Sequence, residues 1–115
     1  DWGYSPDYIR AMWKILQLEE PDDFIISTGS LHSVRDFLDI VFSYLKLDYN
    51  DYVKVDHKFY RESERISLCG NPEKINKATG WINKRKLESI IHEMVDVERN
   101  ALVKLQYSNN ANKCD

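Results

Sequence analysis

The stretch that decides the fold opens the chain and reads Asp1-Trp2-Gly3-Tyr4-Ser5-Pro6-Asp7-Tyr8. It is typical of a helix start, with Ser5 as the N-cap, Pro6 at the first helical position and Asp7 in the first turn. Apolar residues then recur at helical spacing at Ile9, Met12, Trp13 and Leu16. This periodicity predicts a helix from about Pro6 to Leu18. A complete domain would have almost no lead-in before such a helix, so we expect the chain to be part of a larger protein.

Two short segments have strand patterns. Residues 24–27 are a β-branched and aromatic run whose continuous apolarity is typical of a strand that is buried on both faces. Residues 52–56 alternate between apolar and polar side chains, as in a half-buried strand. The order of elements predicts an α/β fold. Two short strands do not make a sheet of ordinary size, so we expect the remaining strands to come from elsewhere. We further expect the apolar faces of the first helix and of 24–26 to be partly uncovered.

Three further helices are predicted. The second helix begins after Ser33 as its cap, with Asp36 at the capping-box position, and runs to Leu45. A short helix starts at Asn71 as cap, with Pro72 in its first turn, and ends at Gly80; the last helix spans about Leu87 to Leu105. We divide the chain into a folded lobe, residues 1–106, and a polar tail, residues 107–115, that we expect to be disordered.

Bulk composition excludes several classes of protein. The chain has 115 residues with a net charge of −3 and scattered basic residues, which argues against nucleic-acid binding. No apolar run is long enough to span a membrane. Cys69 and Cys114 are expected to be free thiols in a reducing, cytoplasmic compartment, and three scattered histidines make a structural zinc site unexpected. At 115 residues the chain is one domain at most, and a chain of this length should bury roughly two-thirds of its unfolded surface.

One segment carries a candidate binding chemistry, Phe59-Tyr60-Arg61-Glu62-Ser63-Glu64. The planar guanidinium of Arg61 is suited to phosphate oxygens, and the Glu64 carboxylate can accept two hydrogen bonds from a vicinal diol such as a ribose. A nucleoside diphosphate offers both groups. The alternative is that these residues and Arg65 form a solvated charge cluster, which would contribute little to stability.

The chain resembles the GDP-mannose 4,6-dehydratases, which are NADP-dependent enzymes of the extended short-chain dehydrogenase/reductase family. Its opening is similar to the family's R-D-W-G-Y-A-x-D-Y-V-E-A-M-W signature. Thr28-Gly29 and the segment 32–37 resemble I-A-T-G-x-x-H-S-V-R-E-F, and 59–65 resemble Y-F/Y-R-P-T/A-E-V. The departures are Glu62 for proline, Arg65 for valine and, further on, Asn71 for aspartate.

The resemblance implies a role for four residues in binding the nucleotide sugar. Arg61 matches the position that contacts the diphosphate, and Glu64 the position that holds the nucleoside through its ribose. Trp2 and Tyr4 match the segment that lines the lower side of the substrate pocket. His32, in the strand-to-helix connection, is expected to cap or pack.

The resemblance also implies a division of the enzyme into two lobes. This chain would be the C-terminal substrate-binding lobe, completed by a Rossmann lobe that holds NADP and the catalytic residues. Its own sequence contains neither G-x-G-x-x-G nor a tyrosine followed four residues later by lysine. We therefore expect the intact enzyme, a lyase and a homo-oligomer, to convert GDP-mannose to GDP-4-keto-6-deoxymannose. The open alternatives are another nucleotide-sugar dehydratase or epimerase, and a non-catalytic nucleotide-binding module.

Overall fold

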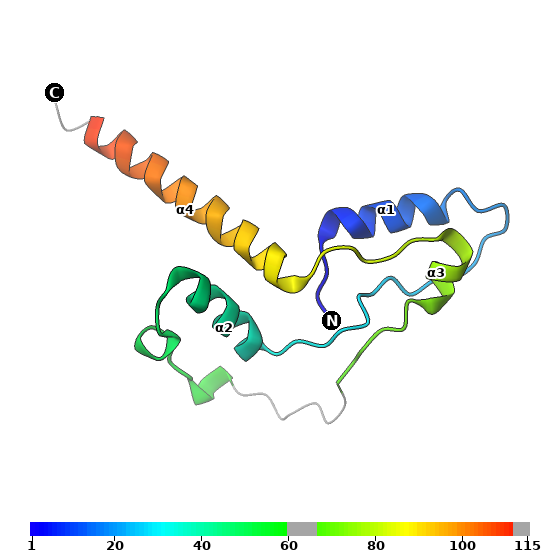
Figure 1. The fold of residues 1–115 in the computed structure, drawn as a ribbon, viewed down its shortest axis with the longest axis horizontal. Coiled ribbons are helices and arrows are strands. Elements are labelled where there is room, and N and C mark those ends of the chain that lie inside the picture. Colours follow the sequence, from blue (N-terminus) through cyan, green and yellow to red (C-terminus); the bar gives the residue numbers. More distant parts are fainter. Residues whose placement is uncertain (60–66, 112–115) are drawn as a thin grey trace.

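The fold is that of a computed structural model, which describes residues 1–59 and 67–111, with the backbone alone for 106–111. The described residues form helices and short 3-10 turns, arranged in an open, elongated shape (Figure 1). In chain order these elements are α1 (Ser5–Ile15), α2 (Val34–Leu45), η1 (Tyr49–Asp51), η2 (His57–Phe59), α3 (Glu73–Thr79) and α4 (Leu87–Ala111).

The predicted strands do not form, so the α/β prediction is wrong for the described part of the chain. Residues 24–27 have no regular secondary structure, and 52–56 are a turn followed by irregular chain. A strand exists only where a neighbouring strand supplies partners for its backbone N–H and C=O groups. The described residues supply no such neighbour, and the side chain of Ile25 remains exposed. The helices are therefore what this chain forms by itself.

The capping box predicted for α2 is confirmed. Ser33 Oγ accepts a hydrogen bond from the Asp36 N–H at 3.1 Å, and Asp36 Oδ2 accepts one from the Ser33 N–H at 2.7 Å. These bonds from Ser33 hold the pKa of the Asp36 carboxyl below its ordinary value. Lys46 ends the helix in the left-handed conformation, with φ of 58°.

The other helix ends differ in detail from the prediction. The N-cap of α1 is Tyr4 rather than Ser5, and no side chain caps it, although Pro6 lies in the first turn as expected. The N-cap of α3 is Pro72, while Asn71 Oδ1 accepts a hydrogen bond from the N–H of Glu73 at 2.9 Å. The left-handed Gly80 ends α3, as predicted.

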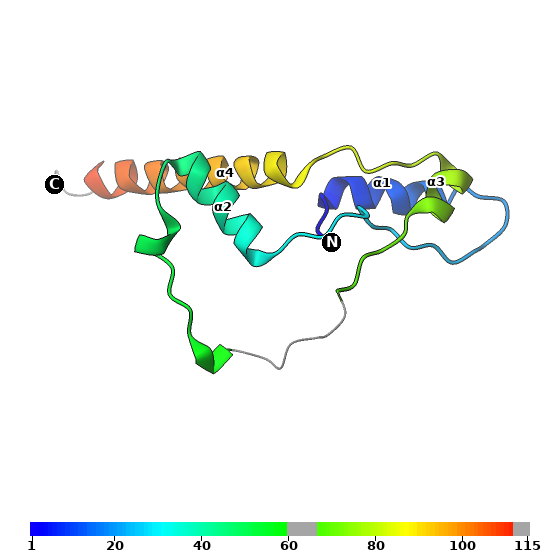
Figure 2. The same cartoon turned by 60° about the horizontal axis from the view of Figure 1, so that its bottom comes forward.

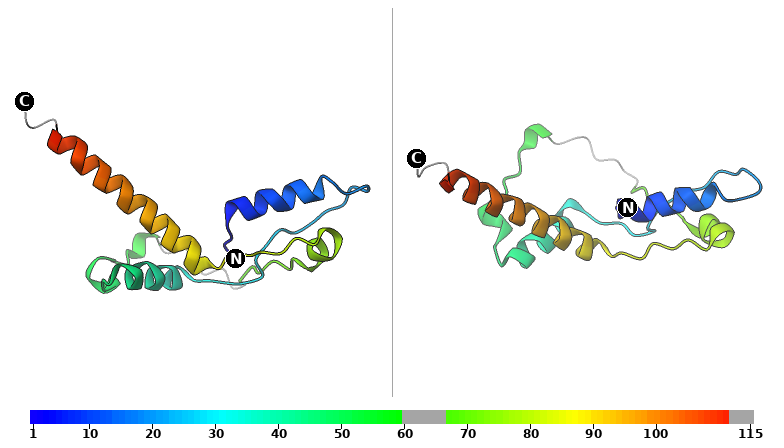
Figure 3. Two further views of the ribbon diagram at one scale, coloured as in Figure 1. Left: turned by 45° about the horizontal axis from the view of Figure 1, so that its top comes forward. Right: turned by 90° about the horizontal axis from the view of Figure 1, so that it is seen from above.

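The last helix is longer than predicted. It was expected to end near Leu105, but α4 continues to Ala111, so the expectation of disorder is wrong for 107–111. The C-terminal part of α4, up to Ala111, extends well beyond α2 (Figure 3). Residues 112–115 lie outside the described residues.

The helices form two separate pairs, α1 with α3 and α2 with α4 (Figures 1 and 2). The first pair encloses a small core of Ala11, Ile75 and Trp81. The indole N–H of Trp81 donates to the backbone carbonyl of Asp7 at 2.9 Å, and Lys14 Nζ donates to the carbonyl of Thr79 at 2.7 Å. These bonds connect α1 both to the end of α3 and to the segment that follows it.

The second pair is held by an aromatic contact and a hydrogen bond. The Tyr44 ring stacks on the His92 ring, with 4.0 Å between centroids, and the Tyr44 hydroxyl donates to the Asp96 carboxylate at 2.9 Å. This acceptor raises the pKa of the Tyr44 phenol. On α4, Leu87 and Ile91 are buried.

Much apolar surface is left uncovered. The accessible area is 10,002 Å², whereas a compact monomer of 13.6 kDa exposes about 6,600 Å². The radius of gyration is 19.7 Å, against about 13 Å for a compact domain of this length. The expected burial of two-thirds of the surface is therefore wrong. The expectation that the apolar face of the first helix is uncovered is confirmed, since Met12 and Trp13 are exposed.

Among residues 1–59 and 67–111, no helix combines the length and apolarity needed to cross a membrane.

The contrast between two tryptophans provides a test of this packing. Trp81 is 4% exposed and Trp13 is 62% exposed. Trp81→Phe should lower the free energy of unfolding by about 1–2 kcal/mol, because it removes the bond to Asp7 and leaves a small cavity. Trp13→Phe, the matched control, should change it by less than about 0.5 kcal/mol. Urea unfolding followed by circular dichroism measures both, and equal effects would contradict the assigned core.

Candidate functional site

A single carboxylate connects three distant segments at the centre of the molecule. Asp1 Oδ1 accepts hydrogen bonds from the Thr28 N–H at 2.8 Å and from the Thr28 hydroxyl at 2.6 Å. Asp1 Oδ2 accepts from the N–H of Gly29 at 3.1 Å and from that of Gly70 at 3.2 Å. Bonds to an ionised acceptor are stronger than neutral ones, so this carboxylate fixes the three segments firmly against one another.

Two glycines permit this close approach. Gly29 has φ of 74°, a conformation that residues with a Cβ rarely adopt. Gly70 lies so close to Ser27 that an added Cβ would stand 2.4 Å from the Ser27 Cβ. A side chain at either position would therefore disturb the segments that Asp1 holds.

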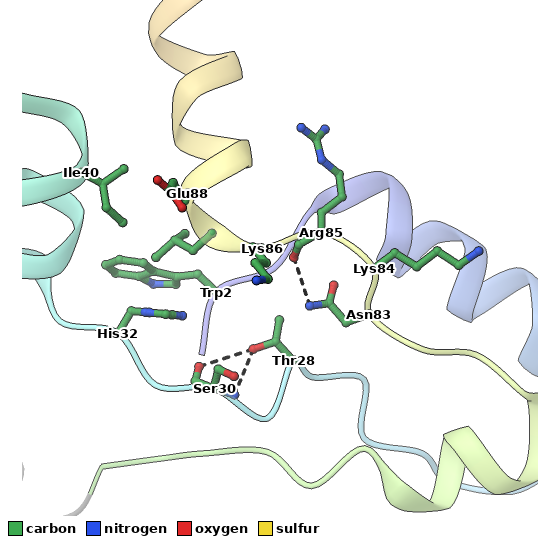
Figure 4. Close-up of a pocket in the computed structure, with 11 residues that line it drawn as sticks. Trp2, Thr28, Ser30, His32, Ile40, Asn83, Lys84, Arg85, Lys86 and Glu88 are labelled. Carbon is green, nitrogen blue, oxygen red and sulfur yellow. Dashed lines mark hydrogen bonds between the residues drawn. The ribbon is translucent and has the colours of Figure 1, made fainter. Parts of the chain in front are cut away.

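Beside this contact lies a cavity of about 560 Å³. Its walls come from the opening residues, the 28–32 loop, α2, the segment 83–86 and the start of α4, namely Trp2, Thr28, Ser30, His32, Ile40, Asn83, Lys84, Arg85, Lys86, Leu87 and Glu88. Figure 4 shows the Trp2 indole between Ile40 and His32, with Thr28 and Ser30 below it. The side chains of Lys84 and Arg85 extend away from this group. The basic run Lys84–Lys86 therefore contributes less positive charge to the cavity than it would if all three side chains pointed into it.

Trp2, one of the predicted substrate-binding residues, lines this cavity. Its ring meets the Phe37 ring edge-on, with 6.0 Å between centroids and an interplanar angle of 88°. Aromatic pairs favour this geometry, which holds the indole in place while leaving it half-exposed. Contact between Trp2 and a ligand stays a prediction.

Tyr4, the second predicted residue of the opening, lies elsewhere. Its ring faces the Arg85 guanidinium at 4.2 Å from the centroid, and its hydroxyl donates to Glu93 at 3.4 Å. Arg85 forms an ion pair with Glu93, and this carboxylate raises the pKa of the guanidinium. Tyr4 borders a smaller hollow along α4, so the structure does not bring Tyr4 and Trp2 into one cavity.

The other two predicted residues, Arg61 and Glu64, lie outside the described residues. Their roles stay predictions. His32 lines the cavity wall and does not cap α2, because Ser33 is the cap.

Sequence reasoning missed several residues of this region. Asp1 was seen only as part of the opening motif, and Asn83 was not singled out at all. Asn83 Nδ2 donates to the Arg85 carbonyl at 3.2 Å, while its buried Oδ1 has no hydrogen-bond partner among the described residues. The Thr28-Gly29 motif, which resembles a strand-to-helix connection of the family, is the sequence signal that could have indicated this edge of the cavity.

The described part of the chain contains no candidate metal site. There, no three His, Cys, Asp or Glu side chains gather in a way that could hold a metal ion. Cys69 is a free, exposed thiol, and Cys114 lies outside the described residues.

Two helix pairs with wide apolar faces uncovered, and a cavity lined by the opening residues, α2 and the start of α4, make an open lobe rather than a closed domain. The comparison with known families identifies the family. Residues 1–94 match the family model of GDP-mannose 4,6 dehydratase, and the chain belongs to this family. The resemblance found in the opening motif is therefore confirmed.

Individual relatives agree with this assignment. The chain is 41% identical over 96 residues to GDP-mannose 4,6 dehydratase 2 of Arabidopsis thaliana, covering 84% of this chain and 26% of that protein. It is 39% identical over 117 residues to the GDP-mannose 4,6 dehydratase of Dictyostelium discoideum, with 85% of this chain and 33% of the relative covered. The Homo sapiens protein of the same name is 35% identical over 117 residues, with 85% and 32% covered. The chain thus spans about a quarter to a third of the length of these relatives.

Proposed function

We propose that this chain is the nucleotide-sugar-binding part of a GDP-mannose 4,6-dehydratase. The intact enzyme, a lyase of the cytoplasm and a homo-oligomer, would convert GDP-mannose to GDP-4-keto-6-deoxymannose, a precursor of GDP-fucose and related deoxysugars. The observation that carries the proposal is the family match over residues 1–94, which includes the positions of Arg61 and Glu64. The uncovered apolar faces support a second, Rossmann lobe as the partner of this one.

The residues of this chain do not fit a resident NADP. The sequence lacks the glycine-rich turn that cradles a dinucleotide, and it lacks the Tyr-x-x-x-Lys pair that serves as acid and base. When bound to the Rossmann lobe, NADP would supply the hydride acceptor and donor for oxidation at carbon 4 and reduction at carbon 6. The hydride taken from carbon 4 would be returned to carbon 6, with loss of water across carbons 5 and 6 in between, so the cofactor would not be consumed.

The proposed role of this chain is to hold the substrate. Arg61 would pair with the diphosphate through two parallel N–H donors, and Glu64 would accept hydrogen bonds from the ribose hydroxyls. Trp2 and Tyr4 would line the pocket. Trp2 has the position for this role, because its half-exposed indole borders the cavity. Tyr4 would act from the neighbouring hollow on α4.

Turnover by the intact protein tests the proposed function. With GDP-mannose and NADP, the intact protein should form a sugar nucleotide that is lighter by one water, without net reduction of NADP. Mass spectrometry of the product and absorbance of the cofactor measure these outcomes. The 115-residue chain by itself should form no product. Turnover by this chain alone would contradict the assignment of catalysis to the other lobe, and preference for a different nucleotide sugar would point to another dehydratase or epimerase.

Arg61→Ala should weaken binding of GDP-mannose to the intact enzyme by roughly 1.5–3 kcal/mol, about ten- to a hundredfold, because a charge-assisted contact to phosphate is lost. KM should rise much more than kcat falls, since the diphosphate does not change charge during the reaction. NADP affinity should stay unchanged. Calorimetric titration with GDP measures the effect directly.

Arg65→Ala is the matched control for Arg61→Ala. It removes the same charge from the same charged segment but not from the position that matches the family motif, so GDP affinity should change by less than about twofold. Equal effects of the two substitutions would mean that both arginines act as a solvated charge cluster.

Glu64→Gln should weaken GDP-mannose binding less than Arg61→Ala does. The amide keeps one acceptor oxygen for the ribose and loses the second, so we expect KM to rise about three- to tenfold. Glu62→Gln is the control, because it makes the same chemical change two residues away, at the position where the family has proline. KM measurements that rank Glu62→Gln above Glu64→Gln would reverse the roles assigned to these residues.

A further inference from the structure

We propose that Asp1 is a positioning residue of the nucleotide-sugar site. Its carboxylate holds one side of the cavity, formed by Trp2, Thr28 and Ser30, in the shape that receives the ligand. The identity of the ligand rests on the proposed function, whereas the action of Asp1 on the cavity rests on its hydrogen bonds.

The bonds of Asp1 reach the cavity by two routes. Trp2 follows Asp1 directly in the chain, so fixing Asp1 fixes the base of the indole that forms the cavity wall. The Thr28 hydroxyl donates to Asp1 at 2.6 Å and accepts a hydrogen bond from the Ser30 N–H at 3.2 Å. Asp1, Thr28 and Ser30 thereby form one connected set of bonds, and the last two of them border the cavity.

The chemistry at this position requires a carboxylate. Both oxygens of Asp1 accept hydrogen bonds, and all four donors are N–H or O–H groups. An asparagine has the same shape but only one acceptor oxygen. Its amide N–H₂ would take the place of one carboxylate oxygen. Either the two donors of Thr28 or the N–H groups of Gly29 and Gly70 would then have no acceptor in the side chain of residue 1.

The principal experiment uses Asp1→Asn in the intact enzyme. KM for GDP-mannose should rise about tenfold, which corresponds to losing one charge-assisted contact, while kcat stays within about twofold. Amide hydrogen exchange should become faster either at Thr28 or at Gly29 and Gly70, whichever side faces the new amide N–H₂, because those N–H groups lose their acceptor.

Asp22→Asn is the matched control. Asp22 is an exposed aspartate that accepts a hydrogen bond from Lys74 Nζ at 2.6 Å and one from the Asp23 N–H at 2.8 Å. The substitution makes the same chemical change at a carboxylate that is likewise hydrogen-bonded but does not border the cavity. It should leave KM unchanged within about twofold.

A second pair of variants tests the route through Thr28. Thr28→Ser keeps the hydroxyl and should keep KM. Thr28→Val keeps the shape and the backbone N–H bond to Asp1, but it loses the hydroxyl that bonds to Asp1 and Ser30, so it should raise KM in the same direction as Asp1→Asn. Because both residues belong to one set of bonds, the double variant Asp1→Asn with Thr28→Val should raise KM by less than the product of the two single increases.

The outcomes separate this proposal from the proposed function. Unchanged hydrogen exchange in Asp1→Asn would overturn the action of Asp1 on the three segments. Faster exchange with unchanged KM would show a purely structural contact and overturn the positioning role. Failure of the wild-type enzyme to act on GDP-mannose would overturn the proposed function instead, and the exchange result would still decide whether Asp1 holds the cavity wall.

Discussion

The arrangement of the two helix pairs depends on the carboxylate of Asp1. Among the described helices, neither α1 nor α3 packs against α2 or α4. What connects the pairs is the opening segment. It acts through the bonds of Asp1 to the 28–29 turn and to Gly70, the edge-on contact of Trp2 with Phe37, and the contacts of Tyr4 with Arg85 and Glu93. A carboxylate that accepts four hydrogen bonds can hold chain segments that lack the apolar contact area to hold themselves.

This dependence on polar contacts follows from the small amount of buried apolar surface. The core of the first pair consists of Ala11, Ile75 and Trp81, with partly buried side chains around it. Such a core contributes little against the entropy of ordering the chain, because stabilisation scales with the apolar area removed from water. The exposed Met12 and Trp13 of α1 would add to it only when covered by further protein. The same surface that leaves this lobe weakly packed is thus the surface by which it would join a second lobe.

Local features of the fold were predictable from the sequence, and features that need a distant partner were not. Ser33 and Asp36 make their capping box within four residues, and Gly80 ends α3 through its own φ angle, so both could be predicted. The strand at 24–27 could not form, because its partners are not among the described residues. The candidate site shows the same difference between local features, which could be predicted, and contacts with distant residues, which could not. Trp2 was predicted from a motif and borders the cavity, but Asp1 holds residues that are 27 to 69 positions away, and no local pattern indicates such contacts.

The basic run Lys84–Lys86 shows why the position of a charge matters more than its presence. By composition this run would be the natural place for a diphosphate. Arg85, however, is occupied by its ion pair with Glu93 and its contact with the Tyr4 ring, and its side chain, like that of Lys84, extends away from the cavity (Figure 4). An arginine that is already paired has little of its charge left for a ligand, because both partners would compete for the same donors. Arg85 therefore ties the opening segment to α4, and the role proposed for Arg61 does not depend on it.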